Sequence, residues 1–116
     1  MSYVMAYVGA VPTDRKDDYL AHSRRMAGIF KEHGATRVVE CWGSAVPPGE
    51  MTSFPLAVKA GDDETVVTGW QEWPDAATQE AGFAAAMQDP RMGNMGDVPI
   101  NGKTMIFAGF DVVVDI

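Results

Sequence analysis

The stretch YVMAYVGAV, residues 3–11, is apolar throughout and rich in residues that favour β-strands. Successive side chains of a strand point to opposite faces, so Tyr3, Met5 and Tyr7 face one way and the residues between them face the other. Both faces of this predicted strand are therefore apolar. A strand in a sheet that helices cover on one side only would instead alternate apolar and polar residues.

The rest of the chain adds two helices and four further strands to this first strand. Asp14 and Asp75 precede the two helical patterns and are typical N-cap residues, whereas Gly34 and Asp89-Pro90 follow them as stop signals. The order of helices and strands along the chain predicts an α+β fold, a ferredoxin-like sandwich with one antiparallel sheet and two helices on one face. The predicted elements are a helix at 15–33, a strand at 36–43, a hairpin of strands at 54–60 and 65–73, a helix at 76–88 and a strand at 103–114.

The second face of this sheet needs a cover that two helices cannot supply. The last predicted strand is also apolar on both sides, with Met105 and Phe107 opposite Ile106 and Phe110. Soluble monomers normally expose apolar patches of only a few hundred Å². We therefore expect a homodimer through the sheet face, which would bury on the order of 1,500 Å² or more. The alternative is that two long loops, at 43–53 and 90–102, fold across the bare face.

Length, charge and cysteine content set the broad class of the protein. The 116 residues fit a single domain spanning 1–116, and the net charge of −7 disfavours binding to nucleic acid. Cys41 is the only cysteine, so an intrachain disulfide is excluded. The first residues have neither the basic start of a signal peptide nor the long apolar run of a membrane span. We expect a cytoplasmic protein that does not bind membranes.

Two predicted strands each bring a glutamate beside a tryptophan. Alternation places Glu40 and Trp42 on one face with Cys41 on the other, and it places Trp70 and Glu72 together. If the two strands are neighbours, both pairs could meet on one face. The tryptophans would then wall an apolar cleft, in which a desolvated glutamate with a raised pKa could act as a general acid or base.

The alternative reading of these residues is structural. Glu40 would pair with Arg37, Lys59 or another cation at the solvent side, and the tryptophans would fill the core or the dimer interface. Cys41 as a nucleophile would need a nearby base or a helix N-terminus. A lone cysteine within a strand is more typical of a small buried side chain.

The histidines and Arg91 complete the candidate residues. His22 and His33 lie on one predicted helix about 16 Å apart along its axis, so they cannot share a metal ion. His22 lies beside Met26, where it would face the space between helix and sheet. Arg91 could hold a substrate carboxylate, cap helix carbonyls or pair with an acidic residue across the dimer. The spacings of zinc ligands, phosphate loops and hydrolase nucleophiles are missing, so we predict no metal site and no cofactor.

Six segments occur together in this sequence: RVVECWG (37–43), TSFPLAVKA (52–60), DETVV (63–67), EWPD (72–75), DPRM (89–92) and MIFAGF (105–110). Together they resemble the YbaA-like family of uncharacterised bacterial proteins, a domain-of-unknown-function family. This resemblance extends over essentially the whole chain and implies a ferredoxin-like protomer in a dimeric α/β barrel. The wider superfamily includes cofactor-free monooxygenases, haem-degrading enzymes, decarboxylases and small-molecule-binding regulators, so membership alone does not select an activity.

Enzymatic and non-enzymatic functions both stay open at this point. The first hypothesis is a homodimer that binds a small molecule in a cleft between helices and sheet. The second is a non-enzymatic dimeric module with a structural or regulatory role, and further alternatives are a cofactor-independent monooxygenase-like enzyme and a haem-binding variant. The candidate catalytic residues are Glu40, Glu72 and His22, and the candidate ligand-binding residues are Met26, Trp42, Trp70 and Arg91.

Overall fold

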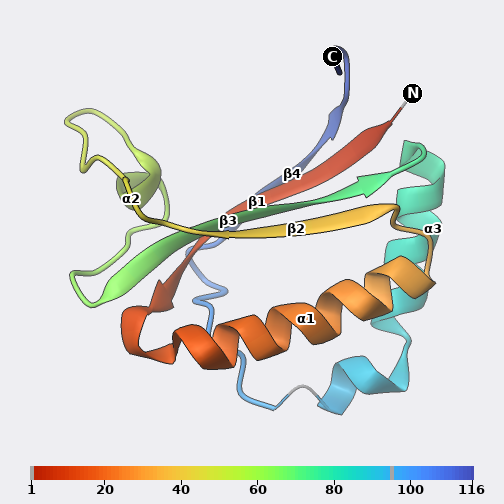
Figure 1. Ribbon diagram of the computed structural model, residues 1–116, viewed down its shortest axis with the longest axis horizontal. Coiled ribbons are helices and arrows are strands. Elements are labelled where there is room, and N and C mark those ends of the chain that lie inside the picture. The colour runs from red at the N-terminus through yellow and green to blue at the C-terminus, as the bar shows by residue number, and fades with distance from the viewer. Residues whose placement is uncertain (1, 95) are drawn as a thin grey trace.

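The computed structural model describes residues 2–94 and 96–116, and its central feature is a four-stranded antiparallel sheet in the order β2-β3-β1-β4. Helix α1 runs beneath the sheet, and α3 stands against one end of it (Figure 1). This is the predicted ferredoxin-like α+β fold. The strands are β1 (Tyr3–Pro12), β2 (Arg37–Trp42), β3 (Glu64–Trp73) and β4 (Ile106–Asp111); the helices are α1 (Lys16–Glu32), α2 (Phe54–Ala57) and α3 (Ala76–Met87), with short 3-10 turns η1 (Thr13–Arg15) and η2 (Pro90–Asn94).

The largest core cluster lies between the two long helices and one end of the sheet. Trp73 of β3 is fully buried there, and its ring meets Phe30 of α1 edge-on at 6.5 Å. Ile29 of α1 and Ala86 of α3 belong to the same cluster. None of the helices in the described ranges is long and apolar enough to cross a membrane.

The helix ends follow the predicted signals at three of four positions. Asp75 accepts a hydrogen bond from the backbone N–H of Thr78 at 2.7 Å and so caps α3, and α3 ends at Met87, before Asp89-Pro90. Gly34 follows α1 with a φ of +118°, a conformation that glycine adopts without steric cost. Asp14 is not the cap of α1, because the chain enters this helix through η1 and Arg15 occupies the N-cap position.

The predicted strand at 54–60 is wrong, and with it the predicted hairpin. Residues 54–57 form α2, which Ser53 caps by accepting a hydrogen bond from the backbone N–H of Leu56 at 3.1 Å. Pro55 lies in the first turn of this helix, where its missing N–H has no helical partner to lose. The segment from Gly43 to Ala60 therefore forms an arm that extends from the end of the sheet (Figure 1).

The two long loops cover different faces of the sheet. Val46, in the predicted loop at 43–53, packs against the buried cluster of Ala10, Val58 and Val66, so this loop covers one end of the face that lies away from the helices. Ile100 of the second loop instead lies over Gly9 on the helix side. The expected alternative, in which both loops cover the bare face, is therefore correct for part of the loop at 43–53 and wrong for the loop at 90–102.

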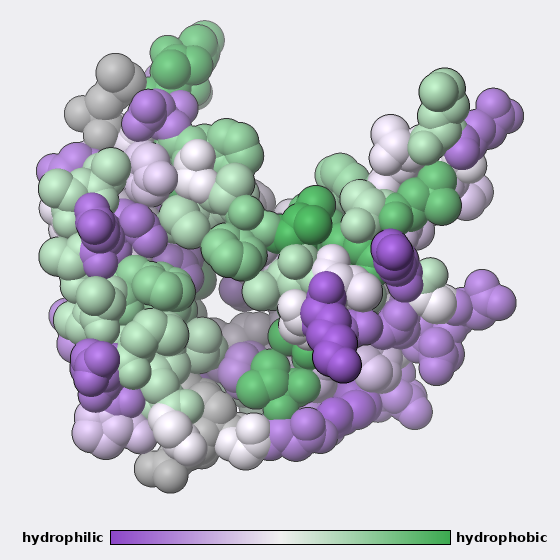
Figure 2. Space-filling model, turned by 180° about the vertical axis from the view of Figure 1, so that it is seen from behind, coloured by the Kyte–Doolittle hydropathy of each residue, from purple (hydrophilic) through white to green (hydrophobic). Residues whose placement is uncertain are grey.

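The bare face of the sheet keeps exposed apolar side chains on β4. Ile106 is 48% exposed and Phe110 is 55% exposed, and their strand pairs with the apolar residues Val8 and Val4 of β1. Seen from behind, apolar surface gathers in the middle of the molecule around a hollow (Figure 2). The prediction of a sheet that is apolar on both faces is confirmed along β1 and β4.

Candidate functional site

One row of residues across three strands brings a carboxylate and a phenol together. Tyr7 of β1 is the cross-strand partner of Gly69 of β3, and Gly69 is in turn the partner of Glu40 of β2. A Cβ atom at Gly69 would lie 2.7 Å from Glu40 Oε2 and 2.7 Å from a ring carbon of Tyr7. Because Gly69 has no side chain, Tyr7 and Glu40 can meet over β3, on the helix side of the sheet.

Tyr19 of α1 completes this group from the helix side of the sheet. Its hydroxyl donates to Glu40 Oε2 at 2.7 Å, and the hydroxyl of Tyr7 donates to the same oxygen. The two hydroxyl oxygens also contact each other, but each phenol has a single proton, so neither donates to the other while both donate to Glu40. We call these three residues the tyrosine–carboxylate cluster. Tyr19 is buried and the other two are half-buried, so the cluster lies between helix and sheet, away from bulk water.

Burial and hydrogen bonding shift the pKa of Glu40 in opposite directions. Burial raises the pKa of the Glu40 carboxyl, the hydrogen bonds from Tyr7 and Tyr19 lower it, and burial prevails. Burial is also the largest cause that raises the pKa of both tyrosines. The phenols therefore stay protonated at neutral pH and remain donors. The carboxyl of Glu40 takes up a proton more readily than an exposed glutamate does.

Aromatic and cationic groups border the cluster. The Trp42 ring centre lies 6.1 Å from that of Tyr19 at an angle of 48°, and Lys16 Nζ lies 5.2 Å from the centre of the Trp42 ring.

His22 of α1 is half-buried, and its Nδ1 atom is buried without a hydrogen-bond partner in the described part of the chain. Burial, followed by the nearby charge of Arg25, lowers the pKa of His22.

The second glutamate–tryptophan pair lies on the opposite face of the sheet. The register pairs Glu40 with Gly69, so Trp70 and Glu72 point away from Glu40. The expectation that both pairs meet on one face is therefore wrong. Trp70 Nε1 donates to Glu72 Oε2 at 2.9 Å, and Arg37 Nη1 lies 3.5 Å from the same oxygen. Arg37 thus pairs with Glu72, not with Glu40 as the structural alternative expected.

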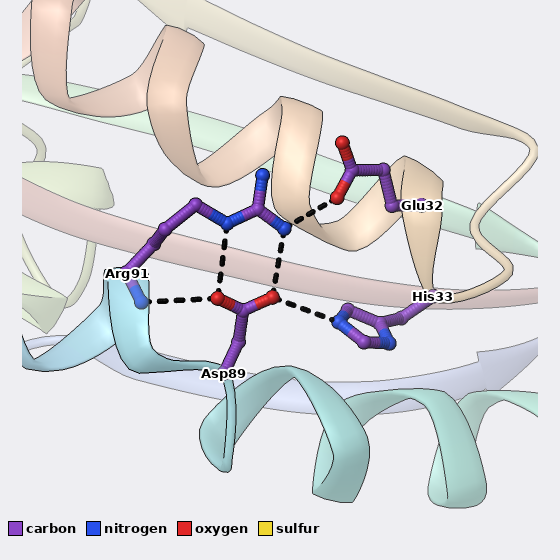
Figure 3. Close-up of polar contacts among 4 residues, drawn as sticks. All are labelled: Glu32, His33, Asp89 and Arg91. Carbon is purple, nitrogen blue, oxygen red and sulfur yellow. Dashed lines mark hydrogen bonds and ion pairs between the residues drawn. The ribbon is translucent and has the colours of Figure 1, made fainter.

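Arg91 belongs to another polar group, at the C-terminal end of α1 (Figure 3). Its Nε and Nη2 atoms donate to the two carboxylate oxygens of Asp89 at 2.9 and 2.7 Å, and Nη2 also contacts the carboxylate of Glu32. His33 Nε2 lies 3.2 Å from Asp89 Oδ2. We call these four residues the arginine cluster. Hydrogen bonds from Arg91 are the largest cause that holds the pKa values of Asp89 and Glu32 below their usual range.

The predicted site residues therefore lie in three places. Glu40 and Trp42 are on the sheet face that α1 covers. Helix α1 carries His22 and Met26, and Met26 packs against the core cluster around Trp73. Trp70 and Glu72 are on the far face, and Arg91 is beside the end of α1.

Sequence reasoning missed Tyr7 and Tyr19 as partners of Glu40. The available signal was Gly69, because a glycine inside a strand often marks a close approach of neighbouring groups.

This chain matches a family model and a full-length relative. A family model described as Protein of unknown function (DUF1428) matches residues 2–102 of this chain. The uncharacterized protein YbaA of Escherichia coli is 46% identical over 116 residues, which cover 99% of each chain.

Two solved structures are similar in fold. A dimeric ferredoxin-like protein from an uncultured marine organism covers 100% of both chains with a TM-score of 0.60 and 12% sequence identity. A variant of SnoaB, a cofactor-independent oxygenase from Streptomyces nogalater, covers 99% of this chain and 96% of that one, with a TM-score of 0.58 and 12% identity. These likenesses confirm the ferredoxin-like fold. The family match and the full-length similarity to YbaA confirm the predicted resemblance, and this chain belongs to the DUF1428 family of proteins of unknown function.

Proposed function

We propose that residues 1–116 form a single domain that pairs with a second copy and binds a small organic molecule between α1 and the sheet. The observation that carries this proposal is the tyrosine–carboxylate cluster. Carboxylates are seldom withdrawn from water unless a cation accompanies them. Glu40 has instead two phenol hydroxyls as its hydrogen-bond partners.

Such an arrangement is costly for stability and useful for recognition. Burial raises the pKa of Glu40, which means that folding disfavours its ionised form. Groups whose pKa values are perturbed in this way are concentrated at functional sites. A ligand with an acidic proton or a hydroxyl group could donate to Glu40, while Trp42 would offer an apolar surface for the rest of the ligand.

The bare face of the sheet supports the second part of the proposal. Ile106 and Phe110 are exposed on β4, and they pair with the apolar residues Val8 and Val4 of β1. Packing this face against a second copy would give the dimeric α/β barrel that the family resemblance implied. The structural neighbour described as a dimeric ferredoxin-like protein is consistent with that assembly.

A second candidate is a cofactor-independent, monooxygenase-like activity in the same place. The specific observation in its favour is that Glu40 combines a raised pKa with two fixed phenol donors. A carboxylate of this kind could remove an acidic proton from a ligand, and the phenols could stabilise the oxyanion that forms. The remaining alternative is a dimeric module with a structural or regulatory role, in which the same residues serve packing alone.

A thermal-shift screen against a metabolite library tests the ligand proposal. A compound at 100 times its Kd should stabilise the protein by about 2.7 kcal/mol. Glu40→Gln and Trp42→Ala should reduce that shift, whereas Glu72→Gln, a matched change on the opposite face of the sheet, should preserve it. A ligand whose shift is unaffected by both Glu40→Gln and Trp42→Ala would remove the proposed site.

Light scattering at micromolar concentration tests the dimer. We expect a particle of twice the 12.5 kDa chain mass, and we expect Phe110→Glu to dissociate it by placing a charge on the apolar face. A well-behaved 12.5 kDa particle for the unmodified chain would contradict the pairing.

A further inference from the structure

A groove of about 370 Å³ runs along α1 beside η2. Arg25, Gly28 and Glu32 lie on the side of α1 opposite the buried residues Tyr19 and Phe30, as the helical repeat of 3.6 residues requires. The groove is therefore separate from the tyrosine–carboxylate cluster, and an inference drawn from it does not depend on the function proposed above. Its lining consists of Arg24, Arg25, Gly28, Ile29, Glu32 and Arg91.

The groove gathers positive charge on an acidic protein. Three arginines and one glutamate line it, and Asp89 binds Arg91, so these five side chains still sum to +1 on a chain whose net charge is −7. Within residues 2–94 and 96–116, Arg24 and Arg25 form no ion pair with a carboxylate. Their charges are thus available to an anion from solution, and a concave surface increases the local potential that they create.

Arg91 differs from the other two arginines because Asp89 already fixes its position. Asp89 accepts from Nε and Nη2, so the guanidinium plane is held in one orientation. Its other terminal nitrogen, Nη1, points away from Asp89 and has no contact among the residues drawn in Figure 3. A fixed guanidinium with unused donors loses little conformational entropy when it binds an anion.

Gly28 leaves the middle of the groove open. A Cβ atom added there would meet nothing within 4 Å, so the space above this residue is free for a ligand. We propose that the groove binds a small molecule through an oxyanion, either a phosphate or a carboxylate, held by Arg24, Arg25 and Arg91. Guanidinium groups match the paired oxygens of both anions in geometry and charge.

A titration of ¹⁵N-labelled protein with inorganic phosphate and, separately, with citrate tests this assignment. Ionic strength is held constant with sodium chloride, so that only specific binding changes the spectrum. We expect saturable shifts of the amide signals of Arg25, Gly28 and Arg91 and of the arginine side-chain signals. The two titrations distinguish the anions, because the anion with the lower Kd carries the oxyanion that the groove prefers. Shifts that never saturate with either anion would overturn the proposal.

Substitution of Gly28 provides a matched pair of variants. Gly28→Glu and Gly28→Gln add side chains of nearly equal size, and both replace a helical glycine with a better helix former, so both should fold. We expect Gly28→Glu to bind the anion about tenfold more weakly than Gly28→Gln, because only the first adds a negative charge to the groove. Equal affinities of the two variants would overturn the proposal.

The arginines themselves supply the second test. The double substitution Arg24→Gln/Arg25→Gln should weaken binding by about tenfold or more, since it removes two charged donors. Lys31→Gln removes an exposed cation of the same helix outside the groove and should leave binding unchanged. If Lys31→Gln weakened binding as much as the double variant did, only the overall charge would matter and the groove would not be a site. Glu40→Gln should leave anion binding intact, which separates this test from that of the proposed function.

Discussion

Helix α1 contributes to two carboxylate clusters that differ in almost every physical respect. The tyrosine–carboxylate cluster lies between the helix and the sheet, and its glutamate is hydrogen-bonded to two phenols. The arginine cluster lies at the C-terminal end of the same helix, and its aspartate is bound by a guanidinium. The pKa of Glu40 is raised, mainly by burial, and the pKa of Asp89 is lowered, mainly by Arg91.

This difference shows that the partner and the environment, not the residue type, determine what a carboxylate does. Phenol hydrogen bonds offset only part of the cost of withdrawing Glu40 from water, whereas an arginine beside Asp89 favours its ionised form. The first arrangement makes the Glu40 carboxyl easier to protonate than an exposed glutamate. The second joins the end of α1 to the segment that follows α3, and it fixes the orientation of Arg91.

The largest expected effect comes from filling the gap above Gly69. Gly69→Ala places a methyl group 2.7 Å from Glu40 Oε2, from a Tyr7 ring carbon and from the carbonyl oxygen of Val39, so at least one of them must move. We expect a loss of about 3 kcal/mol in the free energy of unfolding, measured by chemical denaturation. Gly28→Ala is the control, because its added methyl group meets nothing within 4 Å. Equal stability of the two variants would show that Gly69 is not needed for the cluster.

A smaller effect is expected from removing one phenol hydroxyl. Tyr7→Phe deletes a donor to Glu40, and the loss of a hydrogen bond to a charged group should lower stability by about 2 kcal/mol. The pKa of Glu40 should also rise further, because the bond from Tyr7 lowers it, and a carboxyl ¹³C titration measures this change directly. Tyr3→Phe removes a hydroxyl from the same face of β1 and should leave the Glu40 titration unchanged. An unaltered Glu40 pKa in Tyr7→Phe would contradict the proposed geometry.

The smallest effects concern pH, and they should have opposite signs in the two clusters. Glu40 has a raised pKa, so its contribution to stability is fully present below its ordinary value of 4.5 and is lost as the pH rises through the folded pKa. Asp89 has a lowered pKa, so its contribution is present above its ordinary value of 3.8 and is lost as the pH falls through the folded pKa.

Denaturation midpoints of two variants across pH 2–8 check these signs. Relative to the unmodified protein, Glu40→Gln should gain stability as the pH rises above 4.5, because it lacks the group whose ionisation is disfavoured. Asp89→Asn should be the less stable protein at neutral pH, and its deficit should shrink as the pH falls below 3.8. Difference curves that slope the same way would mean that the two carboxylates share one kind of environment.

The fold could be predicted because its main signals are local. The apolar pattern of residues 3–11, the cap at Asp75 and the stop at Gly34 each identify an element from a few neighbouring residues. The prediction of a strand at 54–60 is wrong because the composition of this segment favours a strand, whereas Ser53 and Pro55 begin a helix through hydrogen bonding and a fixed φ.

The candidate site was harder to predict because it depends on register between distant strands. Alternation correctly places Glu40 and Trp42 on one face of their strand. It does not determine that Glu40 lies opposite Gly69 instead of Trp70, and a shift of one residue reverses the face. Tyr7 and Tyr19 reach Glu40 from elements 33 and 21 positions away in the sequence, which no local pattern encodes.

The antiparallel pairing of β1 with β4 has a further consequence for how this chain could be rearranged. Tyr3 lies opposite Asp111, and the backbone N–H of Val112 donates to the carbonyl of Ser2 at 3.0 Å, so a short peptide could connect the end of β4 to the start of β1 (Figure 1). The exposed tip of the arm, at 47–50, is a suitable place to open new termini. Such a circular permutant would retain every strand pair, yet β3 with Gly69 would leave the ribosome before Tyr7 and Glu40. The order in which the strands are synthesised would change, while their order in the sheet would stay the same.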